Sequence, residues 1–201
     1  MDDLLAGYRR FREQRWPGLA SLHRKLAKGQ RPKTLVIACS DSRVDPSAIF
    51  DASPGELFVV RNVANLVPPY QADGAYHGVS AAIEFAVSRL EVETILVLGH
   101  AQCGGVAAAL DEGSVADTDF LAPWLTLLGP AKSRLDQSRG DACTALEFES
   151  IRVSLENLAS FPFIRAALDA GKVRLEGARF GVADGILELM DPNTGEFARI
   201  D

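Results

Sequence analysis

Thr34–Cys39, with the sequence TLVIAC, runs directly into Ser40-Asp41-Ser42-Arg43, and this junction decides the fold. The first run is aliphatic and β-branched, which is typical of a strand buried on both faces of a parallel sheet. It ends abruptly in polar side chains. If the chain stays extended past the strand, alternate residues point the same way, so Cys39, Asp41 and Arg43 share one small space. The sequence therefore predicts a site at the carboxyl end of this strand.

A second stretch, residues 96–105 with the sequence LVLGHAQCGG, repeats the pattern. An apolar run again ends in metal-ligating residue types, here His100 and Cys103. With Cys39 they offer two thiolates and one imidazole, a donor set that suits zinc and leaves one coordination position open. An open position is typical of a catalytic site rather than a closed structural one. We therefore expect Cys39, His100 and Cys103 to bind one zinc ion.

The Asp41 carboxylate has two possible arrangements beside such an ion. Its carboxylate takes the fourth zinc position in a closed form, or it pairs with Arg43 and leaves that position to water. It cannot do both well, which favours a role as a gate. The simpler alternatives are that Asp41 and Arg43 form only a structural ion pair, and that Cys39 and His100 are only core residues.

Composition excludes several classes of function. The chain has 201 residues, 47% of them hydrophobic and 24% charged, which suits one globular domain with a sizeable core. The formal net charge of −6 argues against binding to nucleic acid or to an anionic membrane surface, since both need a basic surface. No apolar run is long enough to span a membrane, and the N-terminus does not resemble a secretory signal. We expect a cytoplasmic protein.

Three cysteines are too few for a disulfide framework and fit a reducing compartment. Cys143 has no partner at a telling spacing, so we expect a structural helix residue rather than a redox group. His77 lies near a long loop, where a solvated histidine is the simpler interpretation and a proton shuttle is the alternative.

Hydrophobic periodicity predicts an α/β fold with a mostly parallel central sheet flanked by helices. The predicted strands are 34–39, 57–61, 93–98, 173–180 and 186–190, with a last edge strand at 197–200. The predicted helices are 45–50, 78–90, 104–111, 118–137 with a kink at Gly129-Pro130, 142–159, 162–171, and an N-terminal pair over 3–28 that breaks at Trp16-Pro17.

The final strand pair should be antiparallel, and the whole chain, 1–201, should form one domain with an N-terminal helical arm, 1–30, and an α/β core, 31–201. In such sheets ligands bind beyond the carboxyl ends of the strands, where the strand order reverses. An order of 2-1-3-4 makes the strands that carry Cys39 and His100 neighbours and puts the reversal between them.

The sequence Cys-Ser-Asp-Ser-Arg at 39–43, followed at a distance by His-x-x-Cys-Gly-Gly at 100–105, resembles the β-class carbonic anhydrases, and in particular their plant-like branch. Further stretches share the resemblance, which covers roughly residues 20 to 190: 28–33, 54–70, 81–84 and 161–163. It implies the strand order 2-1-3-4, one zinc ion per subunit and a homodimer or dimer-based tetramer in which the arm packs on the neighbour. The implied reaction is the reversible hydration of CO2 to bicarbonate and a proton through a zinc-bound hydroxide, with Asp41 and Arg43 as the catalytic gate.

The resemblance also implies a CO2 pocket, partly across a subunit interface, lined by Gln30, Phe58, Val63, Phe85 and the backbone at Gly104. Phe85 departs from the plant-like pattern, where a tyrosine is usual, so a hydroxyl is missing. A regulated branch of the family stores inhibitory bicarbonate in a second pocket, of which only Arg61 is retained; Val36 and Phe180 replace the other two residues, and we expect no such pocket. The alternatives are a CS2 or carbonyl sulfide hydrolase on the same scaffold and a non-catalytic zinc- or bicarbonate-binding protein.

Overall fold

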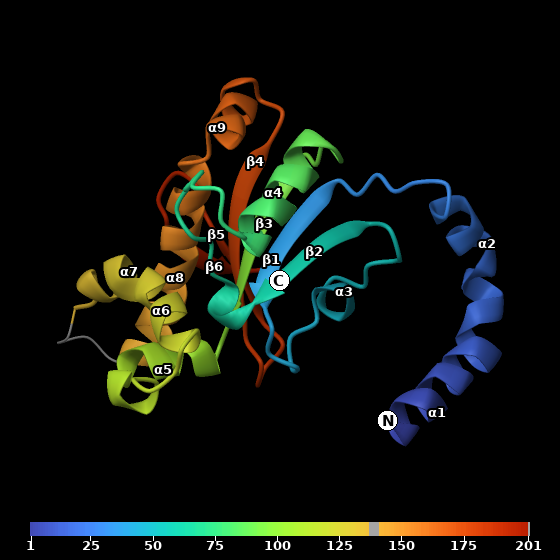
Figure 1. Cartoon of the computed structure of the whole chain (residues 1–201), viewed down its shortest axis with the longest axis horizontal. Helices are drawn as coiled ribbons and strands as arrows, with labels where there is room; N and C mark the ends of the chain where they lie inside the picture. The colour runs from blue at the N-terminus through green and yellow to red at the C-terminus, as the bar shows by residue number, and fades with distance from the viewer. Residues whose placement is uncertain (137–140, 201) are drawn as a thin grey trace.

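The computed structural model describes residues 1–136 and 141–200 and has one six-stranded sheet in the order β2-β1-β3-β4-β5-β6 (Figure 1). The strands are β1 (Thr34–Cys39), β2 (Leu57–Asn62), β3 (Thr94–His100), β4 (Arg174–Phe180), β5 (Leu187–Met190) and β6 (Phe197–Arg199). The first four are parallel, and β5 and β6 pair antiparallel to their neighbours. The predicted strand order and the antiparallel edge are thereby confirmed.

Nine α-helices lie within the described residues: α1 (Asp2–Arg10), α2 (Trp16–Leu26), α3 (Pro46–Ile49), α4 (Gly78–Ser88), α5 (Gly104–Leu110), α6 (Leu121–Leu125), α7 (Gly129–Ser133), α8 (Ala142–Ala159) and α9 (Pro162–Asp169). A π-helical turn, Phe11–Arg15, joins α1 to α2. Short 3-10 turns cover Val63–Asn65, Glu112–Ser114 and Thr126–Leu128. The single kinked helix expected over 118–137 is wrong. Gly129-Pro130 begins α7, because proline suits the first turn of a helix. Residue 137 lies outside the described residues.

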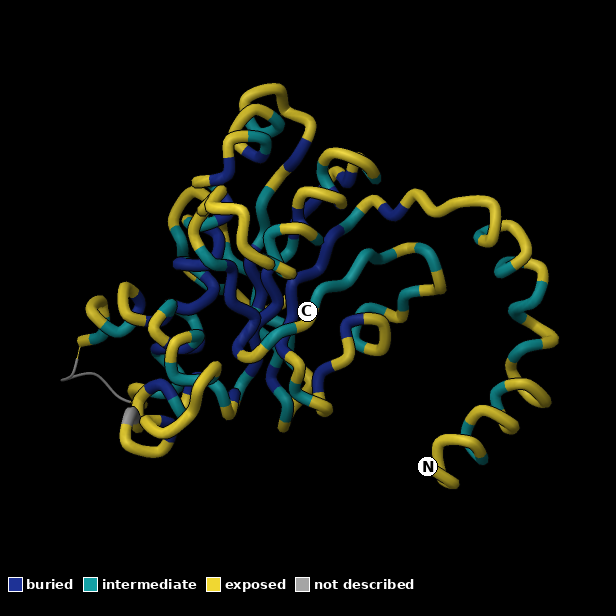
Figure 2. Tube along the Cα trace, in the orientation of Figure 1, coloured by how far each residue is buried: buried dark blue, intermediate teal, exposed yellow. Residues whose placement is uncertain are grey.

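The expected break at Trp16-Pro17 is also wrong, because the arm is helical throughout. Proline lacks the N–H that an α-helix needs in its interior. The π-helical turn that precedes α2 widens the hydrogen-bond spacing, so that Pro17 falls in the first turn of a new α-helical segment. The arm has no buried residue and projects away from the sheet (Figure 2).

The two faces of the sheet are covered unequally. One face packs against α4, α8 and α9, and its cluster includes Leu35, Ile37, Ile83, Ile151 and Ile164. On the opposite face, the cluster around Val36 consists of strand residues together with Ile49 and Phe50 from the region of α3. Several strand residues on that face stay half-buried, among them Leu57, Val59, Leu96, Leu187 and Leu189.

Candidate active site

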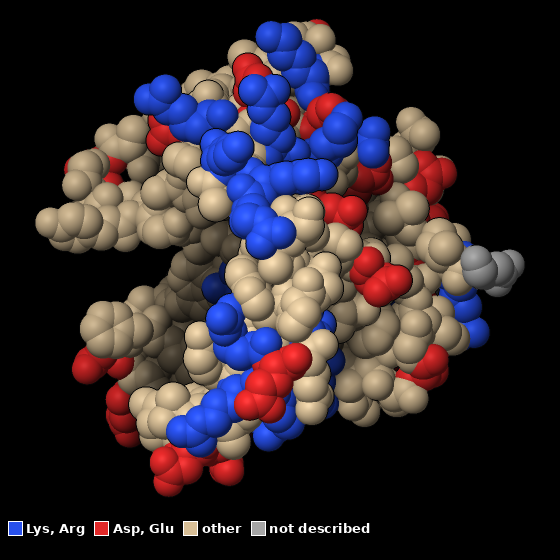
Figure 3. All heavy atoms as spheres, turned by 90° about the vertical axis from the view of Figure 1, so that its right-hand side faces the viewer, with Lys and Arg blue, Asp and Glu red and all other residues tan. Residues whose placement is uncertain are grey.

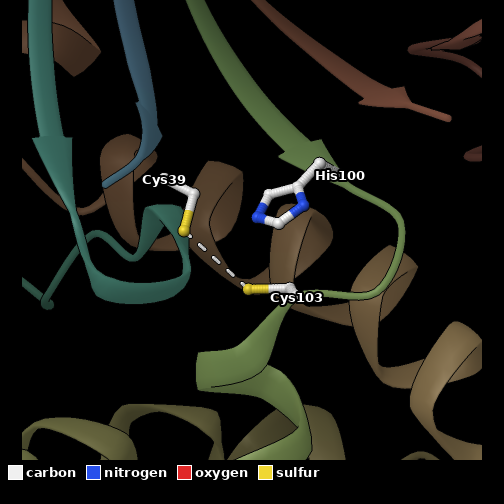
Figure 4. A group of neighbouring side chains, drawn as sticks. All are labelled: Cys39, His100 and Cys103. Carbon is white, nitrogen blue, oxygen red and sulfur yellow. Dashed lines mark hydrogen bonds between the residues drawn. The ribbon is translucent and has the colours of Figure 1, made fainter. Parts of the chain in front are cut away.

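Cys39, His100 and Cys103 meet where the strand order reverses between β1 and β3 (Figure 4). Cys39 is the last residue of β1, His100 is the last residue of β3, and Cys103 is the N-cap of α5. All three are buried, and their donor atoms lie within 4.8 Å of one another. The adjacency follows from the parallel pairing of β1 with β3, which runs from Thr34 opposite Thr94 toward the carboxyl ends of both strands.

The donor atoms fit a tetrahedral zinc ion. The two sulfur atoms are 3.9 Å apart. Two thiolates on one tetrahedral zinc, each at 2.3 Å from it, are separated by about 3.8 Å. His100 Nδ1 donates to the carbonyl oxygen of Ala101 at 2.9 Å, because a carbonyl can only accept. That bond fixes the tautomer and leaves the lone pair on Nε2, which is buried and has no hydrogen-bond partner among the described residues.

The surroundings of Cys39 favour a thiolate. Its pKa is lowered to about 4, first because the Cys103 thiol donates to its sulfur, and further because His100 and the backbone amides of Asp41 and Ala64 face it, while burial opposes the shift. The pKa of Cys103 is raised, because it keeps the proton that the pair shares and because it is buried. A metal ion that replaces this proton would allow both sulfurs to be thiolates.

Asp41 is paired with Arg43. Its Oδ1 accepts from the backbone N and from Nε of Arg43, both at 2.9 Å, and its Oδ2 accepts from Nη2 at 2.7 Å. The hydrogen bonds from the Arg43 side chain and backbone hold the pKa of Asp41 far below its usual range. Asp41 Oδ2 also lies 4.0 Å from His100 Nε2, so the ionised carboxylate borders the three ligands. Of the two arrangements expected for Asp41, this structure contains the ion pair.

Arg61 anchors the loop that carries these groups. From β2 its Nε donates to the carbonyl oxygen of Cys39 at 2.8 Å, and its Nη2 donates to those of Asp41 and Val44 at 2.6 and 2.9 Å. A guanidinium engaged with three carbonyl oxygens has few donors left for an anion. Val36 and Phe180 stand where the regulated branch of the family has the other two residues of its bicarbonate pocket. Val36 is buried in the sheet, and Phe180 is the last residue of β4.

Among the residues expected to line the CO2 pocket, Val63 and Gly104 lie near Cys39, His100 and Cys103 of the same chain. Gly104 follows Cys103 directly, and Val63 packs beside Gly105, where an added Cβ would stand 2.6 Å from Val63 Cγ1. Trp124 Nε1 donates to the carbonyl oxygen of Val63 at 2.9 Å and fixes this turn.

The other three pocket residues lie toward the opposite end of the sheet. Phe58 pairs in register with Leu35, four residues before Cys39, which is about 13 Å along a strand. Phe85 stacks on Phe58 at 5.8 Å between ring centroids, and 47% of its surface is exposed. Gln30 is exposed on the segment that precedes β1. A chain by itself therefore does not assemble the expected pocket around its own ligands.

Two features were missed at the sequence level. Glu147 of α8 is only 2% exposed, and its Oε1 accepts from the Cys103 amide at 3.2 Å. The signal was a polar stripe on a helix that otherwise faces the core, since Ser150 and Ser154 are buried on the same helix. The second feature is the left-handed backbone of Ala64 and Asn65, with φ of 64° and 50°. Asparagine adopts this conformation more readily than most residues, whereas Ala64 gives no such signal.

Cys143 and His77 lie away from the three ligands in the sequence and have local partners. Cys143 is half-buried in the first turn of α8, with its Sγ 3.9 Å from Glu147 Oε1. His77 is the N-cap residue of α4, and its Nε2 is 2.7 Å from Asp73 Oδ1. Neither geometry adds a donor to the group of three.

Comparison with known proteins identifies the family. The sequence model of the carbonic anhydrases matches residues 34–187. β-Carbonic anhydrase 3 of Arabidopsis thaliana is 38% identical over 199 residues, which covers 95% of this chain and 77% of the relative. The chain belongs to the β-carbonic anhydrases. It is thus a carbonate dehydratase of a zinc-dependent family, as the motifs predicted.

Solved β-carbonic anhydrases have the same fold. The structure of the β-carbonic anhydrase CcaA superposes with a TM-score of 0.89 at 32% identity, covering 100% of this chain and 92% of that chain. A tetrameric β-carbonic anhydrase from the filamentous ascomycete Sordaria macrospora gives a TM-score of 0.73 at 28% identity, covering 98% and 94%. Within the described part of the enzyme, no helix is both long and apolar enough to cross a membrane.

Proposed function

We propose that the chain hydrates CO2 reversibly at a zinc ion held by Cys39, His100 and Cys103. The observation that carries this proposal is the His100 Nε2 atom, which is buried, lacks a hydrogen-bond partner within residues 1–136 and 141–200, and lies in a group with two cysteine sulfur atoms whose donor atoms are all within 4.8 Å of one another. A buried polar atom without a hydrogen bond is costly, and a metal ion would remove that cost. Zinc in such a site acts as a Lewis acid that makes water nucleophilic near neutral pH.

Asp41 and Arg43 form the proposed gate. We assign Asp41 Oδ2 to accept the hydrogen bond of the attacking oxygen and so to orient it toward CO2, because this carboxylate is ionised and borders the ligands. Arg43 keeps Asp41 in that position through a fork of two side-chain bonds. In the alternative closed form, Asp41 would leave Arg43 and bind the metal ion. Because Arg61 is occupied by three carbonyl oxygens, we propose that no bicarbonate pocket promotes this closure.

A second copy of the chain completes the proposed pocket. Gln30, Phe58 and Phe85 are distant from their own ligands, and we assign them to the CO2 pocket of a partner subunit. The half-buried strand residues on the sheet face beside α3 offer an apolar surface for such a partner. The assembly proposed is a homodimer or a dimer-based tetramer, and the Sordaria macrospora relative is tetrameric.

The N-terminal arm is the proposed clasp between subunits. Leu4 and Tyr8 are 73% and 59% exposed, which is unusual for large apolar side chains on one helix. Residues 1–30 contain seven Lys or Arg and three Asp or Glu, whereas the whole chain has a net charge of −6. Lysine and arginine side chains gather on the side of the molecule that carries the arm (Figure 3). The same side is hollowed at the left of that view. The basic arm of one copy therefore complements the net negative charge of residues 31–201 in another copy.

A reducing, cytoplasmic compartment suits the site, because both cysteines must stay free to bind metal and the structure contains three free cysteines. The functional unit we propose is one domain over 1–201, with the arm at 1–30 and the core at 31–201.

Stopped-flow CO2 hydration on zinc-loaded protein, from about pH 6.5 to 9, tests the function. The expected result is activity at neutral pH that rises smoothly with pH. Activity that appears only on the alkaline side, and cooperatively, would instead support closure by Asp41. An inactive zinc-bound protein would contradict CO2 hydration, and a parallel assay with CS2 would separate the sulfur-substrate alternative from a non-catalytic zinc protein. Asp41→Ala should reduce the rate on the order of 100-fold while the zinc content is kept.

A further inference from the structure

Glu147 is a buried carboxylate in direct contact with the backbone of a proposed zinc ligand. Its Oε1 accepts from the amide of Cys103 at 3.2 Å. Its Oε2 accepts from Nε and Nη2 of Arg179 at 2.9 and 2.7 Å. Burying a carboxylate costs free energy unless it is paired and hydrogen-bonded. Here Arg179 and the Cys103 amide supply those partners.

The Cys103 amide lacks an acceptor within its own helix. Cys103 is the N-cap of α5, and a helix does not bond the amide of its N-cap residue. In a capping box, a Glu or Gln at the third helical position accepts from that amide. The third helical position here is Val106, which has no acceptor. Glu147 reaches in from α8 and supplies the missing oxygen.

Arg179 holds Glu147 in place. Its Nη1 donates to Glu188 Oε2 at 2.8 Å, and its guanidinium carbon lies 4.7 Å from the centroid of the Phe148 ring. The guanidinium is therefore fixed by two carboxylates and one aromatic face, which leaves it little freedom. A continuous line of side chains thus runs from β5 through β4 and α8 to the Cys103 amide.

The backbone of Ala101 and Gln102, between His100 and Cys103, is also held by hydrogen bonds. The amide of Ala101 donates to the carbonyl oxygen of Phe180 at 2.8 Å. The carbonyl oxygen of Gln102 accepts from Arg43 Nη2 at 2.9 Å, and Gln102 has a left-handed φ of 57°. Such a backbone persists only when its surroundings hold it. The Glu147 bond completes this restraint at the residue that carries the second sulfur.

We infer that Glu147, supported by Arg179, is a positioning residue that sets the orientation of the Cys103 sulfur for the metal ion. The inference rests on the proposed metal site but not on the identity of the substrate. Groups that orient metal ligands typically change metal affinity about 10- to 100-fold when they are lost.

Two double variants separate this role from simple structural support. Glu147→Gln with Arg179→Gln keeps an oxygen for the Cys103 amide and a neutral amide pair in place of the ion pair. Glu147→Met with Arg179→Met removes both charges and the oxygen, and apolar replacement of a whole buried ion pair is commonly tolerated by the fold. Glu149→Gln is the matched control, because Glu149 lies on the same helix but forms ion pairs with Arg152 and Arg134 rather than with Arg179.

The measurement is zinc affinity of the full chain by competition with a chelating dye, with the absorption spectrum of the cobalt-substituted protein as a second readout. We expect zinc binding to weaken about 10- to 100-fold in the methionine pair and to stay within a few-fold of wild type in the glutamine pair and in Glu149→Gln. The cobalt spectrum should change only in the methionine pair.

Equal zinc affinity of the two double variants would overturn the inference, whether both match wild type or both are weak. If the methionine pair does not fold, Glu147→Leu with Arg179→Leu takes its place, because it likewise removes both charges and the oxygen. Wild-type protein that binds zinc but does not hydrate CO2 would contradict the proposed reaction alone, whereas wild-type protein that fails to bind zinc would contradict both.

Discussion

Arg43 Nη2 donates to the carbonyl oxygen of Gln102 across 2.9 Å. This single bond connects the loop after β1 to the loop after β3, although the two residues are 59 positions apart in the chain. Since the same nitrogen also binds Asp41, the proposed gate and the segment between two proposed ligands share one donor.

Replacing Arg43 with lysine tests this shared donor. Lysine keeps the positive charge but cannot form the fork, because it offers a point charge on a flexible stem. We expect CO2 hydration to fall on the order of 100-fold in Arg43→Lys, since small displacements of a catalytic group have effects of that size. Stability should change little, because 45% of the Arg43 side chain is exposed. Stopped-flow rates and chemical denaturation measure the two effects, and an unchanged rate would refute the assigned role.

Removal of zinc should destabilise the fold. A metal ion that binds only the folded state, at 100 times its dissociation constant, adds about 2.7 kcal/mol to the free energy of unfolding. Chelation should therefore lower the melting temperature, and added zinc should restore it. Magnesium should not, because it prefers oxygen ligands. In Cys103→Ser the response to zinc should be strongly reduced; if that variant responds like wild type, Cys103 is not a ligand.

The two glycines at the start of α5 should differ in their tolerance of alanine. An added Cβ at Gly104 meets nothing within 4 Å, whereas at Gly105 it would stand 2.6 Å from Val63 Cγ1 and 3.1 Å from the Cβ of Ala64. Gly105→Ala should cost about 1–3 kcal/mol, because the turn has to move. Gly104→Ala should be neutral or slightly stabilising. Denaturation curves of both variants provide the comparison, and equal effects would argue against the close approach of this turn.

Glu156 should contribute a small, pH-dependent part of the stability. Its pKa is lowered, first because Arg134 donates to both carboxylate oxygens at 2.7 Å, while partial burial opposes the shift. A lowered folded-state pKa stabilises the protein above the unfolded value, about 4.3, and this stabilisation is lost as the pH falls through the folded-state pKa.

The Glu156 side chain is 54% exposed, so solvent screening keeps the effect below about 1 kcal/mol. Glu156→Gln should be less stable than wild type at pH 7, and the difference should shrink in acid and in high salt. Urea denaturation at several pH values measures it. A difference that grows as the pH falls would contradict the assigned sign.

Much of the site was predictable because its signals are local. An apolar run that stops at Cys39 and another that stops at His100 already indicate two buried strands with ligands at their carboxyl ends. His100 and Cys103 are separated by only two residues, so their proximity could be predicted without knowing the fold. The parallel order then follows from alternation of strands and helices, and it brings the two strand ends together.

The sequence by itself thus determined the donor set, the strand order expected from the family resemblance and the strands that carry the ligands. Only the tertiary structure decided which side chains support them. Glu147, Arg179 and Arg61 reach the site from α8, β4 and β2, and their roles depend on packing between segments far apart in the chain. The continuous arm helix was equally hidden, because its π-helical turn relieves the constraint that Pro17 imposes locally. Short-range patterns specify where a strand ends, whereas the partners of a buried polar group are chosen by the whole fold.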